Sequence, residues 1–198
     1  MKYKKFFLAS ILVLMTSSIA SAHPGHGNNG LAGGFIHPFS GIDHLLAMIA
    51  VGLWAVQLGG AALYLLPISF VSVMVFGGLL AKLGLHIGDP DAFITTSLLV
   101  LGLLIAFAAR LPLIAGTGLV GLFAIFHGYA HVQEGVLEQG HSMAEFAVGF
   151  VAATIILHCI GIAIGLSLKN RTGARLVRLA GAGIAACAVL IWMGWIQT

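Results

Sequence analysis

Charged residues are scarce in this chain. Of its 198 residues, 8% are Asp, Glu, Lys or Arg and 60% are hydrophobic, whereas an ordinary soluble domain has about 25% charged residues. These charges are too few to cover the surface of a water-soluble fold. The composition therefore excludes a soluble globular protein. It indicates that the surface of this protein contacts a lipid bilayer. The positive charge behind the formal net charge of +3 lies mainly in residues 2–5 and 169–178, which indicates membrane topology and no nucleic-acid partner.

Cysteine is also rare. The two cysteines, Cys159 and Cys187, both lie inside apolar runs, so the sequence supports neither a disulfide framework nor a Cys-rich zinc site. A phosphate-binding loop of the G-x-x-x-x-G-K-S/T type is missing as well. A transport activity driven by ATP would therefore need another subunit.

The first 22 residues have the three parts of a secretory signal peptide. Three lysines between positions 2 and 5 precede the apolar run 6–15, and Ala20-Ser21-Ala22 forms a small-x-small cleavage site. The apolar run is short for a ~30 Å hydrocarbon core, so we expect cleavage rather than an uncleaved anchor helix. The predicted organisation is a signal peptide, residues 1–22, followed by one mature domain, residues 23–198, that begins outside the cytoplasm.

Six long apolar stretches follow the signal peptide, and each has roughly the 20 residues that a spanning helix requires. Glycine, proline or charged residues separate neighbouring stretches. The sequence therefore predicts an all-α fold, a polytopic membrane bundle of six transmembrane helices. The expected spans are Phe39–Leu58, Ala61–Ala81, Ala92–Ala109, Leu111–Val132, Met143–Leu168 and Leu176–Ile196.

Basic residues are unevenly distributed between the two sides of these spans. With the mature N-terminus outside, the outer loops hold Lys82 at most. Cytoplasmic loops of membrane proteins carry an excess of Lys and Arg. We therefore expect a bacterial inner-membrane protein with both mature termini in the periplasm. The basic residues of the inner loops and their flanks are Arg110, Lys169, Arg171, Arg175 and Arg178.

Two clusters of ionisable residues lie within or at the ends of the spans, where such groups are costly and mark functional positions. The first contains His37, Asp43 and His44, at the outer start of the first span. In an unbroken helix His37 and His44 would share a face about 10.5 Å apart along the axis. Pro38 and Gly41 between them are expected to loosen the helix and shorten that distance.

The second cluster contains His127, His131 and Glu134, near the end of the fourth span. Their spacing of four and three residues places two imidazoles and a carboxylate in one stripe of a helix. Because this span rises outward from residue 111, His127 would lie about 24 Å up a ~30 Å core. Both clusters are thus expected in the outer third of the membrane.

Imidazole and carboxylate groups without thiolates suit a borderline divalent metal such as Ni²⁺, Co²⁺ or Zn²⁺. Ligand type does not choose among the three. The alternative is that these histidines hydrogen-bond to neighbouring helices and stabilise the bundle. Two clusters at matching depth, each with a carboxylate, favour the metal site.

The residues of both clusters resemble the motifs of the HupE/UreJ family of bacterial nickel permeases, which accompany hydrogenase and urease gene clusters. The family motif H-x-x-x-x-x-D-H is matched by His37, Asp43 and His44. Val132 stands where the second motif, F-H-G-x-A/V-H-G-x-E, has glycine, which we expect to stiffen that helix end. That motif is otherwise matched by Phe126, His127, Gly128, Ala130, His131 and Glu134.

The resemblance covers nearly the whole mature chain and implies the signal peptide and the six-helix plan. It also implies a role as a permease for nickel, with cobalt as the other known substrate of the family, and a link to hydrogenase or urease maturation. The transported metal would be a substrate, and no fixed cofactor and no enzymatic activity are expected. The implied metal-binding residues are His37, Asp43, His44, His127, His131 and Glu134.

Two other functions compete with transport. An intramembrane metalloenzyme would use the His-x-x-x-His pair, but Gly128 follows His127, so the H-E-x-x-H order and its general base are missing. A membrane accessory or sensor protein would bind the metal without transporting it. Metal accumulation by cells that express the chain alone separates transport from both.

Three further histidines are candidates for a supporting role. His23 and His26, at the expected mature N-terminus, are either weak metal collectors or part of a solvated tail. His158 lies about 22 Å below the outer end of the fifth span. It is either a relay ligand between the outer site and the cytoplasm or a packing histidine that hydrogen-bonds across the bundle.

Overall fold

The architecture was obtained as a computed structural model that describes residues 30–137 and 143–197, with only the backbone for residues 134–137. Every regular element in this part of the chain is an α-helix, as the sequence predicted. The helices are α2 (Leu31–Ser40), α3 (Ile42–Leu58), α4 (Ala62–Lys82), α5 (Pro90–Ala106), α6 (Leu113–Leu137), α7 (Met143–Ser167) and α8 (Arg171–Trp192).

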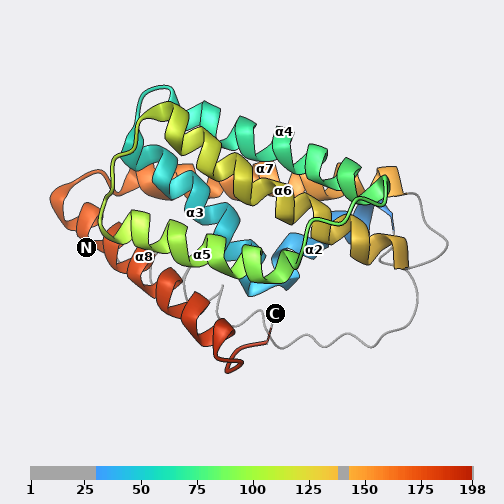
Figure 1. Cartoon of the computed structure of the whole chain (residues 1–198). Coiled ribbons are helices and arrows are strands. Elements are labelled where there is room, and N and C mark those ends of the chain that lie inside the picture. Colours follow the sequence, from blue (N-terminus) through green and yellow to red (C-terminus); the bar gives the residue numbers. More distant parts are fainter. Residues whose placement is uncertain (1–29, 138–142, 198) are drawn as a thin grey trace.

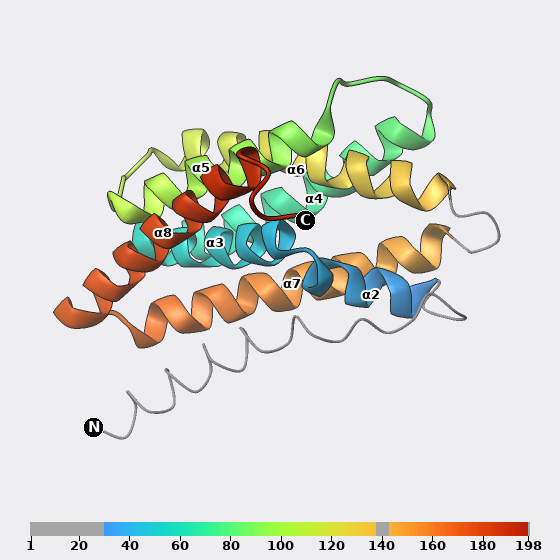
Figure 2. The ribbon, with the colours of Figure 1, turned by 90° about the horizontal axis from the view of Figure 1, so that it is seen from below.

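The helices run back and forth, so their connections collect at two ends of the bundle (Figures 1 and 2). The connections between α3 and α4, between α5 and α6, and between α7 and α8 lie at one end, which we call the basic end. The beginning of α2 and the connection between α4 and α5 lie at the other, which we call the histidine end. This alternation matches the up-and-down order expected for successive membrane spans.

Glycines hold the main helix pairs together by letting their backbones touch. Helix α4 packs on α6, α5 on α8, and α7 on both α2 and α3. A Cβ atom on Gly77 of α4 would lie 2.1 Å from the carbonyl oxygen of Ile125 in α6. A Cβ atom on Gly128 of α6 would lie 1.8 Å from the carbonyl oxygen of Met74 in α4, so neither position has room for a side chain. Such small-residue contacts are typical of helix pairs in membranes.

The first span, predicted as Phe39–Leu58, is broken near its start, at Gly41, one of the two residues expected to loosen the helix. Helices α2 and α3 meet at Gly41 with a bend of 84°. Residues 31–38, which precede the first predicted span, form most of α2. At the break Gly41 has extended dihedral angles, φ −92° and ψ 124°. Pro38, one turn earlier inside α2, cannot donate a backbone hydrogen bond to the preceding turn.

The number of membrane spans is supported in part. Within the described residues, α4, α6, α7 and α8 are long and apolar enough to cross a membrane, and the bent pair α2–α3 would make a fifth span. Helix α5 has 17 residues, a rise of about 25 Å, which is short for a ~30 Å core. The sixth span therefore stays a prediction, as does the signal peptide, which lies outside the described residues.

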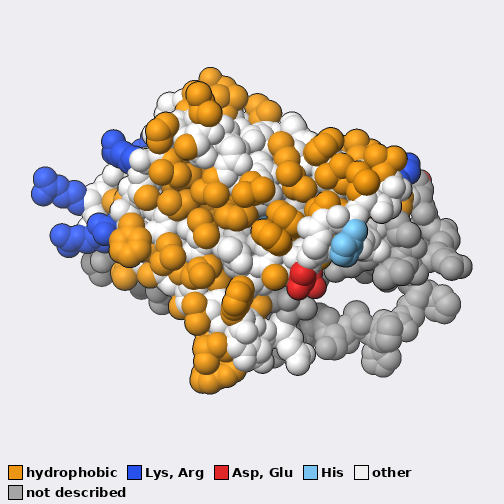
Figure 3. Space-filling model, in the orientation of Figure 1, with side chains coloured by type: hydrophobic (Ala, Val, Ile, Leu, Met, Phe, Trp, Pro, Cys, Tyr) orange, Lys and Arg blue, Asp and Glu red, His pale blue; other side chains and the backbone are white. Residues whose placement is uncertain are grey.

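The surface agrees with a membrane setting. Large apolar side chains such as Tyr64, Ile68, Phe76 and Leu79 of α4 are exposed, and apolar side chains cover much of the face in Figure 3. Lys and Arg side chains gather at the end where α8 begins (Figure 3). The chain is thus a multi-pass membrane protein whose basic residues are concentrated at one end.

Candidate functional site

The break between α2 and α3 brings the histidines of the first cluster close together. His37 lies in α2 and His44 in the first turn of α3, and the bend brings their ring centroids to 6.1 Å. A Cβ atom at Gly41 would lie 2.8 Å from Asp43 Oδ1 and 3.0 Å from His44 Nδ1. Gly41 therefore leaves room for the Asp43–His44 pair, which a side chain at the bend would displace.

Asp43 fixes the orientation of the His44 imidazole. Asp43 Oδ1 lies 2.8 Å from His44 Nδ1 and also accepts the His44 backbone N–H at 2.8 Å. A carboxylate oxygen accepts hydrogen bonds, so the proton of a neutral His44 ring belongs on Nδ1. The lone pair is then on Nε2, which is buried and has no hydrogen-bond partner in the described part of the chain. This carboxylate–imidazole pairing is the usual way in which proteins orient a histidine that binds a metal.

His127 has the same arrangement with a backbone acceptor. Its Nδ1 lies 2.9 Å from the carbonyl oxygen of Phe123, one turn earlier in α6. Because a carbonyl oxygen only accepts, Nδ1 carries the proton and Nε2 carries the lone pair. This Nε2 is also buried without a hydrogen-bond partner among the described residues. Both histidines therefore present an unprotonated Nε2 in the interior.

The structure brings the two sequence clusters together. The ring centroid of His131 lies 4.6 Å from that of His37 and 4.4 Å from that of His44. The rings of His44 and His127 are 5.5 Å apart. His127 and His131 are 0% and 3% exposed, so these two imidazoles lie inside the bundle rather than facing lipid, while His37 and His44 are half-buried.

Two aromatic residues of α7 that belong to neither sequence motif line one side of this cluster. Phe150 lies 4.3 Å from His131 and 6.1 Å from His37, centroid to centroid, and Phe146 lies 5.8 Å from His37. On another side, the Phe70 ring of α4 lies 5.2 Å from that of His127. These residues are hard to recognise in sequence because a phenylalanine is unremarkable in an apolar helix.

The cluster is a group of neighbouring donors and not a formed coordination shell. Within the described ranges 30–137 and 143–197, no three His, Cys, Asp or Glu side chains are placed to hold one metal ion. Glu134 belongs to α6, but its side chain lies outside the described part of the chain. Metal binding by these imidazoles would require side-chain rotations that turn ring contacts into nitrogen–metal contacts.

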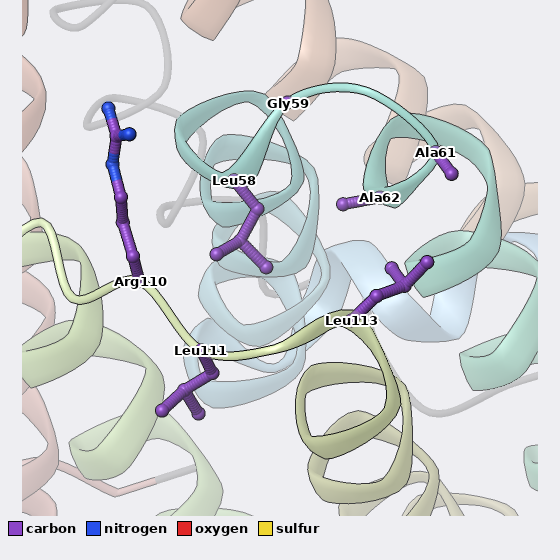
Figure 4. A pocket seen from close by; sticks show the side chains of 7 residues that line it. All are labelled: Leu58, Gly59, Ala61, Ala62, Arg110, Leu111 and Leu113. Carbon is purple, nitrogen blue, oxygen red and sulfur yellow. The ribbon is translucent and has the colours of Figure 1, made fainter.

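A pocket at the basic end is distinct from the histidine cluster (Figure 4). It has a volume of about 280 Å³, and Arg110 is its single charged lining residue. Leu58, the last residue of α3, lies on its wall, whereas His44 lies at the opposite end of that helix. The pocket offers no imidazole or carboxylate, so it is not a candidate metal site. The other lining residues are Gly59, Ala61, Ala62, Leu111 and Leu113.

Fold and site together define a class, that of multi-pass helical membrane proteins with a buried imidazole cluster beside a carboxylate. The model of the family described as HupE / UreJ protein matches residues 11–191. The chain is also 38% identical over 194 residues to Protein HupE of Rhizobium leguminosarum bv. viciae, across 98% of this chain and 100% of that protein. The chain therefore belongs to the HupE/UreJ family, which confirms the resemblance read from the two motifs. No solved structure is significantly similar to it.

Proposed function

We propose that this chain is a permease that takes up a divalent transition metal, Ni²⁺ or Co²⁺, from the periplasm into the cytoplasm of a bacterial cell. The observation that carries the proposal is the meeting of His37, His44 and His131 inside the bundle, with ring centroids 4.4 to 6.1 Å apart. The association of the HupE/UreJ family with nickel and cobalt transport supports the same function.

The donors suit this class of metal. Imidazole nitrogens without thiolates favour borderline divalent cations, and ligand type does not separate Ni²⁺ from Co²⁺. His44 and His127 would bind through Nε2, because Nδ1 of each is engaged with Asp43 or with the Phe123 carbonyl. Asp43 would act through His44 and would offset part of the charge of the cation. Glu134 would supply a second carboxylate, as its place in the family motif implies.

The direction of transport follows from topology and potential. In the proposed orientation the histidine end faces the periplasm and the basic end faces the cytoplasm, so both mature termini are periplasmic and the protein lies in the inner membrane. A membrane potential, negative inside, favours entry of a divalent cation by about 4.6 kcal/mol per 100 mV. The imported metal would supply hydrogenase or urease maturation, the partners that the family resemblance implies.

Accumulation of radioactive nickel or cobalt by cells that express the full chain alone tests this function. We expect accumulation above the empty-vector level, and we expect four single alanine variants to abolish it while the amount of inserted protein stays near normal. His86→Ala is the matched control, because His86 is exposed in the connection between α4 and α5 at the same end of the molecule. The four variants are Asp43→Ala, His44→Ala, His127→Ala and His131→Ala.

Two results would contradict the proposal. Inserted protein that binds the metal without raising accumulation would indicate an accessory or sensor protein. Accumulation that is unchanged in all four variants would show that transport does not depend on the histidine cluster.

A further inference from the structure

His158 is a buried histidine that the proposed outer site does not use. It lies on α7 and is 1% exposed. Phe150, Thr154 and His158 are spaced by four residues, so they share one face of this helix. Phe150 contacts the outer imidazoles His37 and His131. His158 therefore lies about 12 Å further along α7 from that layer, toward the basic end.

The two ring nitrogens of His158 are unpaired within the described part of the chain. Both Nδ1 and Nε2 are buried and make no hydrogen bond with any residue that the structure describes. A packing histidine that bonds across the bundle was the alternative to a relay ligand, and that bond is not found in the described part of the chain. Leaving a buried polar group unpaired costs about 1–3 kcal/mol. An apolar side chain of similar size would therefore serve packing better than this imidazole does.

The surroundings of His158 connect it to the outer cluster. The Phe70 ring of α4 lies 5.1 Å from the His158 ring and 5.2 Å from the His127 ring, centroid to centroid. On the α3 side the backbones of α3 and α7 touch, since a Cβ atom on Gly52 would lie 2.3 Å from the carbonyl oxygen of His158. One phenyl ring is thus the shared neighbour of an outer imidazole and of this deeper one.

We propose that His158 is a second binding position for the transported divalent cation, deeper in the bundle than the outer imidazoles and next to them across Phe70. The ion passes from the Nε2 side of His127 to a nitrogen of His158 on its way to the basic end. This inference rests on the proposed function and adds a residue to it. The two family motifs do not include His158.

The first test compares His158→Phe with wild-type protein in proteoliposomes. Phenylalanine fills the space of the imidazole and removes both nitrogens. We expect nickel uptake to fall about 10- to 100-fold, while nickel binding at the outer site, measured by titration calorimetry, stays within a factor of about two of wild type. Thermal stability should be unchanged or higher, because the variant removes unpaired buried nitrogens. His86→Phe is the control.

The second test detects the metal at this position directly. In a background with Cys159→Ser and Cys187→Ser, the His158→Cys variant places a thiol, a strong nickel ligand, at the proposed position. We expect a sulfur-to-nickel charge-transfer band in the near ultraviolet when Ni²⁺ is added, and we expect His127→Ala to weaken it. The same background carrying His86→Cys controls for binding at the surface.

The outcomes separate this inference from the function on which it rests. If wild-type protein neither binds nor accumulates nickel, the proposed function fails and the inference fails with it. If wild-type protein transports nickel and His158→Phe transports it equally fast, the inference alone is overturned. Absence of the charge-transfer band in a well-inserted His158→Cys variant that retains outer-site binding would overturn it in the same way.

Discussion

At the scale of residues, hydrogen bonds decide which nitrogens are available for a metal. Asp43 and the Phe123 carbonyl each bond to the Nδ1 atom of a histidine, and each leaves a buried Nε2 atom that has no hydrogen-bond partner among the described residues. Unpaired buried nitrogens are unfavourable in the absence of a ligand. In the proposed function, binding of a cation through these nitrogens would regain the free energy that they cost.

Asp43→Asn tests the role of the carboxylate charge. The amide has nearly the same shape, and its Oδ1 can still accept the proton that His44 Nδ1 donates, but it carries no negative charge to raise the basicity of the imidazole or to offset the charge of a cation. We expect the affinity for Ni²⁺ to fall about 10- to 100-fold, as measured by titration calorimetry on the purified protein. A wild-type affinity in Asp43→Asn, with His86→Ala as control, would show that the charge has no such role.

The pH dependence of uptake tests whether the imidazoles bind the metal. A histidine must be neutral to donate its lone pair, and a free imidazole takes up a proton as the pH falls through about 6.5. The neutral, binding-competent form is therefore lost on acidification. We expect initial rates of uptake into proteoliposomes to decrease below an external pH of about 6. Rates that increase under these conditions would argue against neutral histidine ligands at the outer site.

At the scale of elements, close contacts between helix backbones hold the histidines in place. Helix α6 carries His127 and His131, and its Gly128 lies against the backbone of α4. Val132, which replaces the family's glycine, packs over Gly78, where a Cβ atom would lie 2.9 Å from Val132 Cγ2. Helix α6 continues to Leu137, so the helix persists through the position where this chain departs from the motif.

Gly128→Ala tests the contact between α4 and α6. The new Cβ atom would lie 1.8 Å from the Met74 carbonyl oxygen, so the helices must separate. We expect a loss of about 1–3 kcal/mol in stability, the usual cost of overpacking, and a lower midpoint of thermal unfolding in detergent. Gly118→Ala is a control on the same helix, because its Cβ atom would meet nothing within 4 Å. Equal midpoints for the two variants would show that the contact is unimportant.

At the scale of the whole molecule, the basic end and the histidine cluster lie at opposite ends of the bundle. The basic end includes the start of α8 at Arg171, and the histidine end includes the connection with the exposed His86. The excess of Lys and Arg predicts that the basic end faces the cytoplasm. A cation that enters at the histidine end would therefore move inward along α7 past His158.

Cysteine labelling tests this orientation. In a variant without the two native cysteines, we expect an impermeant maleimide to label His86→Cys in intact spheroplasts and to label Arg171→Cys only after the membrane is permeabilised. Labelling after permeabilisation is the control for reactivity. A label at position 171 in intact spheroplasts would reverse the orientation and the proposed direction of transport.

Much of the fold follows from composition and spacing. Apolar runs of about 20 residues predict membrane helices because backbone groups in lipid must be paired within the segment. Helices α4, α6, α7 and α8 follow their predicted ranges to within a few residues, except that α8 starts at Arg171 rather than Leu176 and α6 extends beyond Val132. Both motifs were also recognisable without a structure, since ionisable residues are rare in apolar segments.

The sequence by itself determined that the chain is a helical membrane protein and which imidazoles and carboxylates are its functional candidates. The tertiary structure decided the 84° break at Gly41, because a bend depends on what packs against both helices. It also decided which rings meet, since the contacts between His37, His44 and His131 join segments about 90 residues apart. The tertiary structure also decided that the His158 ring finds no hydrogen-bond partner in the residues described, because a hydrogen bond across a bundle depends on groups that no local pattern brings together.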